Sequence, residues 1–172
     1  VQEVVNKTVR GDFKAALDSM NPEFLKVMAR PFGGPKRLKA QYLRQMQAMG
    51  KNGVTFQAAI TRRADSAFEV DYGFEDLLVD GQKVMGPDGK PKQVARYRKW
   101  MVFVPTVKDF QYLDKSTNPA KLRRFRKWDF EIAISPKGQE KWTFVNGNGM
   151  NALQLRKVFK CDPTNNQAQQ YF

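Results

Sequence analysis

Apolar residues in the first third of the chain recur every three or four positions, which is the spacing of one face of an α-helix. This pattern predicts a helix over residues 3–20. Arg10-Gly11-Asp12 falls inside it, so we predict a joint between two helical segments there, with the Asp12 carboxylate capping the second. We favour this interpretation over an adhesion signal, which would need an exposed, flexible loop tip. The apolar positions are Val5, Val9, Phe13, Leu17 and Met20.

Two further helices are predicted before the pattern changes. Asn21-Pro22 is typical of a helix start, because asparagine caps well and proline lacks only an N–H that has no partner at that position. Residues 31–35 predict a turn. A second apolar stripe then predicts a helix that ends at Gly50 and Gly53. Its members are Leu38, Tyr42, Met46 and Met49.

From Val54 onward the hydrophobic period is two, which is the period of β-strands. Asp80-Gly81 and the turn at 87–89 leave room for only a short excursion over 82–85. Residues 151–159 predict a short terminal helix. The strands are expected near residues 54–61, 68–74, 94–104, 128–135 and 140–146.

The alternation within two of these strands predicts which faces are buried. Asp129 and Glu131 are expected to point outward to solvent. Strand 97–104 is apolar on both faces beyond Lys99, so we expect it to be central or covered on its second face. A homodimer partner would supply that cover. The expected inward-facing residues of strand 128–135 are Trp128, Phe130, Ile132 and Ile134.

Helices followed by antiparallel strands predict an α+β fold, with N-terminal helices packed on a strongly curved antiparallel sheet and a short C-terminal helix. A length of 172 residues favours a single domain over 1–172. The 41% hydrophobic content argues against disorder. No apolar run has the length needed to span a bilayer.

The chain is strongly basic, and its charges are distributed in blocks. There are 30 Lys and Arg against 17 Asp and Glu, a net charge of +13. Residues 24–64 carry nine basic side chains and no acidic one, whereas residues 65–82 carry six acidic side chains and no basic one. Residues 96–127 return to ten basic against two acidic. These blocks predict surface regions of opposite charge.

Several kinds of chemistry are excluded by composition. The chain has no histidine, and Cys161 is its single cysteine. Histidine-dependent general bases, Ser–His and Cys–His pairs, and metal sites built from histidine or several cysteines are therefore ruled out. We predict neither a metal nor a cofactor. The Gly-x-Gly within residues 146–150 lacks the rest of a dinucleotide fingerprint and predicts a turn.

Four local patterns resemble one superfamily: GDFKAALDSMNPEFL, FGGPKRLKAQYLRQM, DFEIAISPKGQEKWTFVNG and KWTFVNGNGMNALQLRKVF. Together they resemble the nuclear-transport-factor-two-like superfamily, also called the cystatin-like cone, and the last resembles the end of uncharacterised bacterial envelope members. The resemblance implies a cone-shaped sheet that encloses a pocket, in a protein of the bacterial periplasm or cell envelope. Segments 75–95 and 105–127 exceed what a minimal member needs and predict elaborated hairpins.

The implied pocket makes large aromatic side chains candidates for its lining. Ordinary core packing is the alternative interpretation of the same residues. The function we favour is that of a noncatalytic domain that binds a small apolar ligand or a protein. The candidate lining residues are Tyr42, Tyr72, Trp100, Trp128 and Trp142.

A histidine-independent isomerase or dehydratase is one alternative. The resemblance implies a carboxylate base in the pocket, often paired with His or Tyr. Because strand alternation directs the acids outward, we favour this alternative less. The candidate hydroxyls are those of Tyr42, Tyr72 and Tyr97, and the candidate carboxylates those of Asp71, Asp129 and Glu131.

Basic and aromatic residues are interleaved in KLRRFRKW, residues 121–128. Its cations would bind phosphates while Phe125 and Trp128 stack on bases or lie at a lipid interface. Many basic hairpin tips are only solvated, however, and the acids at 65–80 would neutralise part of the charge. The other alternative function is therefore binding of an anionic polymer or membrane surface. The candidate contacts are Lys121, Arg123, Arg124, Arg126 and Lys127.

Overall fold

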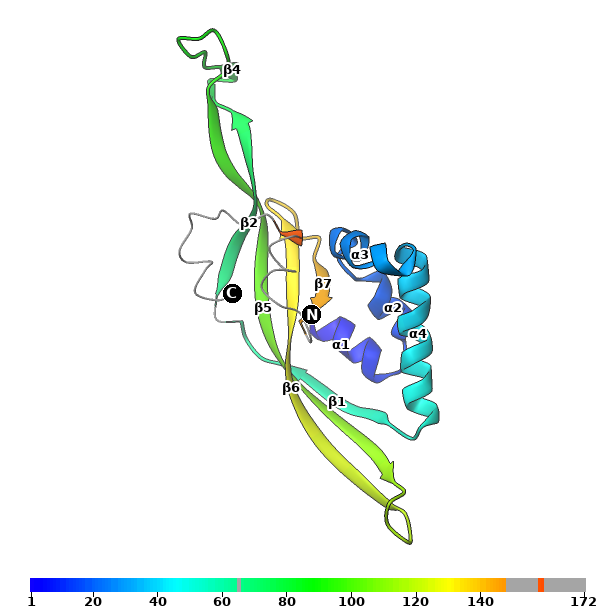
Figure 1. The fold of residues 1–172 in the computed structure, drawn as a ribbon. Helices are drawn as coiled ribbons and strands as arrows, with labels where there is room; N and C mark the ends of the chain where they lie inside the picture. The colour runs from blue at the N-terminus through cyan, green and yellow to red at the C-terminus, as the bar shows by residue number, and fades with distance from the viewer. Residues whose placement is uncertain (65, 148–157, 160–172) are drawn as a thin grey trace.

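The protein has an α+β fold, as predicted, in a computed structural model that describes residues 1–64, 66–147 and 158–159. The N-terminal helices lie together on one side of an antiparallel sheet that does not close into a barrel (Figure 1). The described helices are α1 (Gln2–Val9), α2 (Phe13–Asp18), α3 (Pro22–Met28), the short 3-10 helix η1 (Arg30–Phe32) and α4 (Pro35–Lys51).

The predicted joint at Gly11 and the predicted helix start at Asn21 are both confirmed. Gly11 has a φ of +81°, a conformation that glycine adopts without steric cost. The Asp12 carboxylate accepts a hydrogen bond from the Ala15 N–H at 3.0 Å and so caps α2. Asn21 Oδ1 accepts hydrogen bonds from the first N–H groups of α3 in the same way. The Arg-Gly-Asp tripeptide is thus a joint between helices.

One long strand, β5, organises the sheet. Its 22 residues pair with β2 and then β1 along one edge and with β6 along the other, and β7 pairs with β6. The predicted central position of strand 97–104 is confirmed, although β5 extends to Asp114. The described strands are β1 (Thr55–Thr61), β2 (Ala67–Asp76), β3 (Leu78–Val79), β4 (Gln82–Lys83), β5 (Gln93–Asp114), β6 (Lys121–Pro136) and β7 (Thr143–Asn146).

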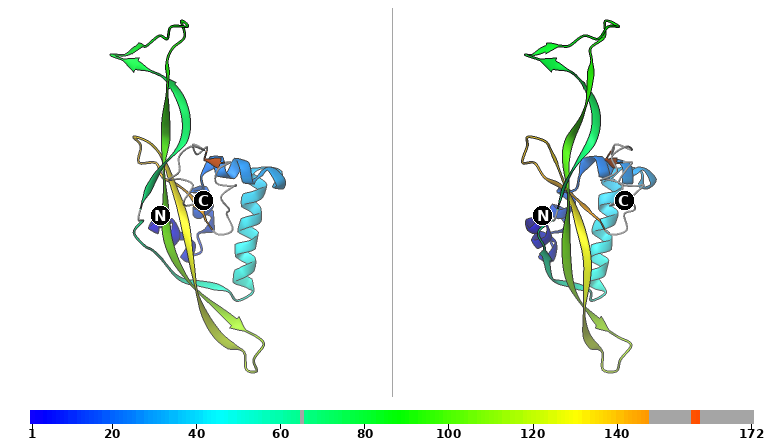
Figure 2. Two further views of the ribbon diagram at one scale, coloured as in Figure 1. Left: turned by 60° about the vertical axis from the view of Figure 1, so that its left-hand side comes forward. Right: turned by 90° about the vertical axis from the view of Figure 1, so that its left-hand side faces the viewer.

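Two hairpin arms project from opposite ends of the body (Figure 2). The upper arm, residues 72–97, consists of β2 and β5 beyond the end of β6 and carries the small β3–β4 sheet. The lower arm, residues 109–126, is the far end of the β5–β6 hairpin. The two long segments that the sequence singled out, 75–95 and 105–127, lie largely in these arms.

The main core is centred on Ile132 and Ile134 of β6, which are buried as predicted, and Phe130 packs against it. α3 and the segment at 158–159 both contribute to this cluster. Its buried members are Phe24, Val70, Met101, Ile132, Ile134, Val145, Val158 and Phe159.

Two predictions about β6 are wrong. Trp128, predicted to face inward, is 60% exposed because it lies beyond Phe130, where the core cluster ends. Asp129 and Glu131, predicted to face solvent, have side chains that are only 5% and 14% exposed. Helices α1, α2 and α4 lie over that face of β6, so both faces of the strand are covered at this point.

The chain itself covers much of strand 97–104. Met101 and Val104 are both buried, although alternation places them on opposite faces. The apolar second face therefore does not require a partner, and the homodimer stays a prediction. The predicted C-terminal helix over 151–159 lies outside the described residues except for Val158 and Phe159. None of the described helices is long and apolar enough to cross a membrane.

Candidate functional site

A cavity of about 490 Å³ lies between the helices and the sheet. Helices α1, α2, α3 and α4 line one side, and strands β1, β5, β6 and β7 line the other. The volume is within the range of pockets that hold small organic molecules, roughly 300–1,000 Å³. The position between two layers makes this cavity the candidate site.

The walls of the cavity are mostly apolar because the helical stripes found in the sequence point into it. Phe13 and Leu17 come from α2, Met46 and Met49 from α4, and Phe56 from β1. Methionine side chains adapt to irregular shapes, so such walls suit a ligand with a substantial apolar body.

The sheet side of the cavity carries a charged cluster formed by Lys108 of β5 with Asp129 and Glu131 of β6. Lys108 Nζ lies 3.2 Å from Asp129 Oδ2 and 2.9 Å from Glu131 Oε1. The three side chains are between 5% and 14% exposed. Because water is largely excluded, these charges interact more strongly than a surface pair would. Removing one of them would leave the others as uncompensated buried charges, which is costly.

Glu131 is the member of this cluster that is best placed to meet a ligand. Burial raises the pKa of its carboxyl above the ordinary value, and the nearby Lys108 ammonium opposes this only in part. Its Oε1 accepts hydrogen bonds from Lys108 and from Asn146 Nδ2. Within the part of the chain that the structure describes, its Oε2 makes no hydrogen bond. That oxygen can accept a hydrogen bond from a molecule in the cavity.

The register of β5 and β6 explains how the cluster assembles. Thr106 lies opposite Asp129, and Lys108 lies opposite Lys127. Alternate residues share a face, so the lysine reaches both carboxylates diagonally. The signal in the sequence was Lys108 at the end of an apolar run, and it was missed because the strand was predicted to end at residue 104.

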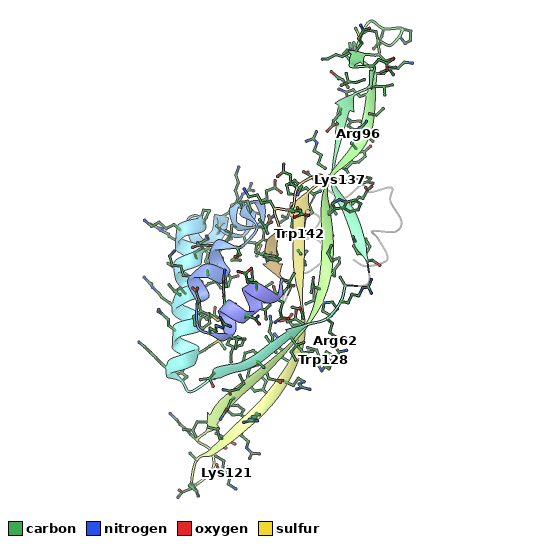
Figure 3. The ribbon with its side chains drawn as sticks, turned by 180° about the vertical axis from the view of Figure 1, so that it is seen from behind. Arg62, Arg96, Lys121, Trp128, Lys137 and Trp142 are labelled. Atoms are coloured by element: carbon green, nitrogen blue, oxygen red, sulfur yellow. The ribbon has the colours of Figure 1, made fainter. Side chains whose placement is uncertain are left out.

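The structure brings one of the five predicted lining residues to the cavity. Tyr42 of α4 lines it. Tyr72 contacts the ring of Tyr97 in the upper arm, with centroids 5.5 Å apart. Trp100 lies under the Lys137 ammonium at 4.8 Å, and Trp128 and Trp142 are among the exposed residues. Figure 3 shows that Trp128 and Trp142 lie well apart.

Some of the candidate carboxylates and hydroxyls line the cavity and others do not. Asp71 pairs with Lys99 of β5 at 3.1 Å and does not line the cavity. Asp129 and Glu131 line it together with Tyr42. The structure therefore leaves two of the predicted carboxylates and one of the predicted hydroxyls in a shared cavity.

The five predicted basic contacts lie in β6 but have different surroundings. Arg126 forms a two-point pair with Asp109, and Arg123 contacts Asp114 at 3.2 Å. Lys127 lines the cavity and reaches Asp129 at 3.7 Å. Lys121 and Arg124 are exposed and make no ion pair with any residue that the structure describes.

No protein family, curated protein or solved structure matches this chain. Within the described ranges, no group of three acidic or cysteine side chains is arranged to hold a metal ion. The function of the protein must therefore be inferred from the geometry and chemistry of the cavity.

Titration of Glu131 provides a first test of this site. Since its folded-state pKa is raised, the folded protein holds this proton more tightly than the unfolded chain does. Wild type is therefore expected to lose stability relative to Glu131→Gln as pH rises from below the ordinary glutamate pKa through the raised value. Urea unfolding of both proteins across this pH range measures the difference. If the free energy of unfolding of wild type instead increased relative to that of Glu131→Gln as pH rises, the raised pKa of Glu131 would be contradicted.

Proposed function

We propose that this chain is a noncatalytic binding domain that holds a small, largely apolar molecule in the cavity between the helices and the sheet. The observation that carries the proposal is an apolar cavity with one buried polar cluster on its wall. Apolar walls supply affinity through burial, and a few placed polar groups fix orientation. A hydroxyl or amine on the ligand would donate to Glu131 Oε2.

The resemblance to the nuclear-transport-factor-two-like superfamily is consistent with this proposal. Helices over one face of an antiparallel sheet, with a cavity between them, are what a cone fold would require. We include the cone arrangement and an accessory role in a bacterial cell envelope in the proposal.

The test uses N-phenyl-1-naphthylamine, a neutral fluorescent probe with an apolar body and one N–H donor. Wild type is expected to enhance its fluorescence saturably. Ala16 lines the cavity from α2, so Ala16→Phe places a ring in the ligand space and should abolish most of the enhancement. Ala15 is the neighbouring residue and does not line the cavity, so Ala15→Phe is the matched control. Equal enhancement by Ala16→Phe and wild type would argue against the proposal.

A second candidate function, proton transfer, is favoured by the position of Glu131 in the cavity wall next to Lys108 and Asp129, where burial raises the pKa of its carboxyl. A carboxylate whose pKa lies nearer neutrality is a better general base. Once a bound molecule is identified, incubation with the protein separates the two functions. A binding domain returns it unchanged, whereas a catalyst converts it and loses this turnover in Glu131→Gln.

A further inference from the structure

A row of large apolar side chains is exposed along one face of the lower arm and its base. Leu122 is 62% exposed and Trp128 is 60% exposed. Ile60 of β1 lies in the same row as Trp128, because both flank Val107 in the sheet register. Leu113 lies directly opposite Leu122 near the tip of the arm. The apolar residues at the tip and at the base are separated on this face by two polar pairs, Gln111 with Arg124 and Asp109 with Arg126. Grouped exposure of large apolar side chains favours an interaction surface.

Cations are interleaved with this apolar row. Arg124 lies on the same face as Leu122, and Lys121 is at the tip of the arm (Figure 3). Neither makes an ion pair with a described residue, whereas the charge of Arg126 is compensated by Asp109. The arm therefore presents uncompensated positive charge next to exposed apolar surface, which is the combination that anionic lipid surfaces attract.

The surroundings of the aromatic rings favour a lipid surface over a nucleic acid. Bases bind by stacking on free aromatic faces. The ring of Phe125 is already stacked on Phe110, with centroids 4.8 Å apart and planes at 6°. The Arg62 guanidinium lies 4.6 Å from the centre of the Trp128 ring, so one face of each ring is already in contact within the protein. Leu122, by contrast, gains nothing from a base but gains free energy among acyl chains.

We propose that the lower arm docks on an anionic lipid surface. Leu113 and Leu122 enter the interfacial region, and Trp128 lies nearer the headgroups, where tryptophan is commonly found. Lys121 and Arg124 contact lipid phosphates. The net charge of +13 draws the chain toward such a surface. This inference does not depend on the cavity or its occupant.

Vesicle flotation tests the proposal, with vesicles of three parts phosphatidylcholine to one part phosphatidylglycerol. Wild type is expected to float with these vesicles and to remain below with phosphatidylcholine alone. The double variant Lys121→Gln/Arg124→Gln should lower the partition coefficient about thirtyfold, because each basic residue near an anionic surface raises this coefficient about fivefold and two are removed. Leu122→Gln should lower it about tenfold without a change in charge.

The matched control is Lys90→Gln/Lys92→Gln, which removes the same charge from exposed positions in the upper arm. Its partition coefficient should stay within about threefold of wild type if the lower arm is the docking site. Equal losses in the two double variants would overturn the proposal, as would failure of wild type to float. A third result would also overturn it: Leu122→Gln floats as wild type does, and wild type binds oligothymidylate whereas Lys121→Gln/Arg124→Gln does not. The arm would then be a nucleic-acid surface. Circular dichroism verifies that each variant is folded.

Discussion

Replacement of Lys108 with methionine is expected to lower the free energy of unfolding by about 3–5 kcal/mol. The substitution keeps an unbranched side chain but removes the ammonium that lies between Asp129 and Glu131. Two nearly buried carboxylates then face each other without a cation in direct contact with both. Urea unfolding at neutral pH measures the loss, which is a large part of the stability of an ordinary domain.

Lys99→Met is the matched control, because Lys99 lies in the same strand and also contacts two acids, Glu23 and Asp71. The Glu23 side chain is 51% exposed, so water can solvate it when the lysine is removed. The expected loss is about 1 kcal/mol.

A second variant identifies the cause of the Lys108 effect. Neutralising both carboxylates in Lys108→Met/Asp129→Asn/Glu131→Gln should recover most of the lost stability. A triple variant as unstable as Lys108→Met would show that the loss comes from packing rather than from uncompensated charge.

Phe159→Ala is expected to lower the free energy of unfolding by about 3–5 kcal/mol, the usual cost of truncating a buried phenylalanine. Phe159 is 1% exposed and belongs to the core cluster of Ile132, Val70 and Met101. Its loss leaves a void within this core cluster. Thermal and urea unfolding of the variant measure the change.

Phe74→Ala is the comparison for this experiment. Phe74 is 57% exposed in the upper arm, so its truncation should cost less than about 1 kcal/mol. Similar small losses in both variants would mean that Phe159 does not contribute to the core as the structure places it.

The elements that the sequence predicted well have strong local signals. Asn21-Pro22 and Asp12 determine helix starts through hydrogen bonds to nearby N–H groups, so neighbouring residues suffice to predict them. Ile132 and Ile134 follow a simple alternation next to a core that covers one face.

The charged cluster of the candidate site was not predicted, because it depends on contacts between residues that are distant in the sequence. Asp129 and Glu131 are charged and alternate with apolar residues, a pattern that ordinarily indicates a solvated face. Only the packing of α1, α2 and α4 over that face, together with Lys108 from the neighbouring strand, makes their burial possible. Trp128 shows the converse, because its hydrophobicity predicts burial but no described helix or strand extends the core to it.

The length of β5 has a consequence for how this protein meets other molecules. Twenty-two residues at about 3.3–3.4 Å each give a strand of at most about 75 Å. One continuous strand thus enters both arms and contributes Lys108 to the cavity between them. The strand holds the two arms far apart, so a small partner bound at one arm cannot contact the other. Only an extended surface or a large assembly can contact both arms at once.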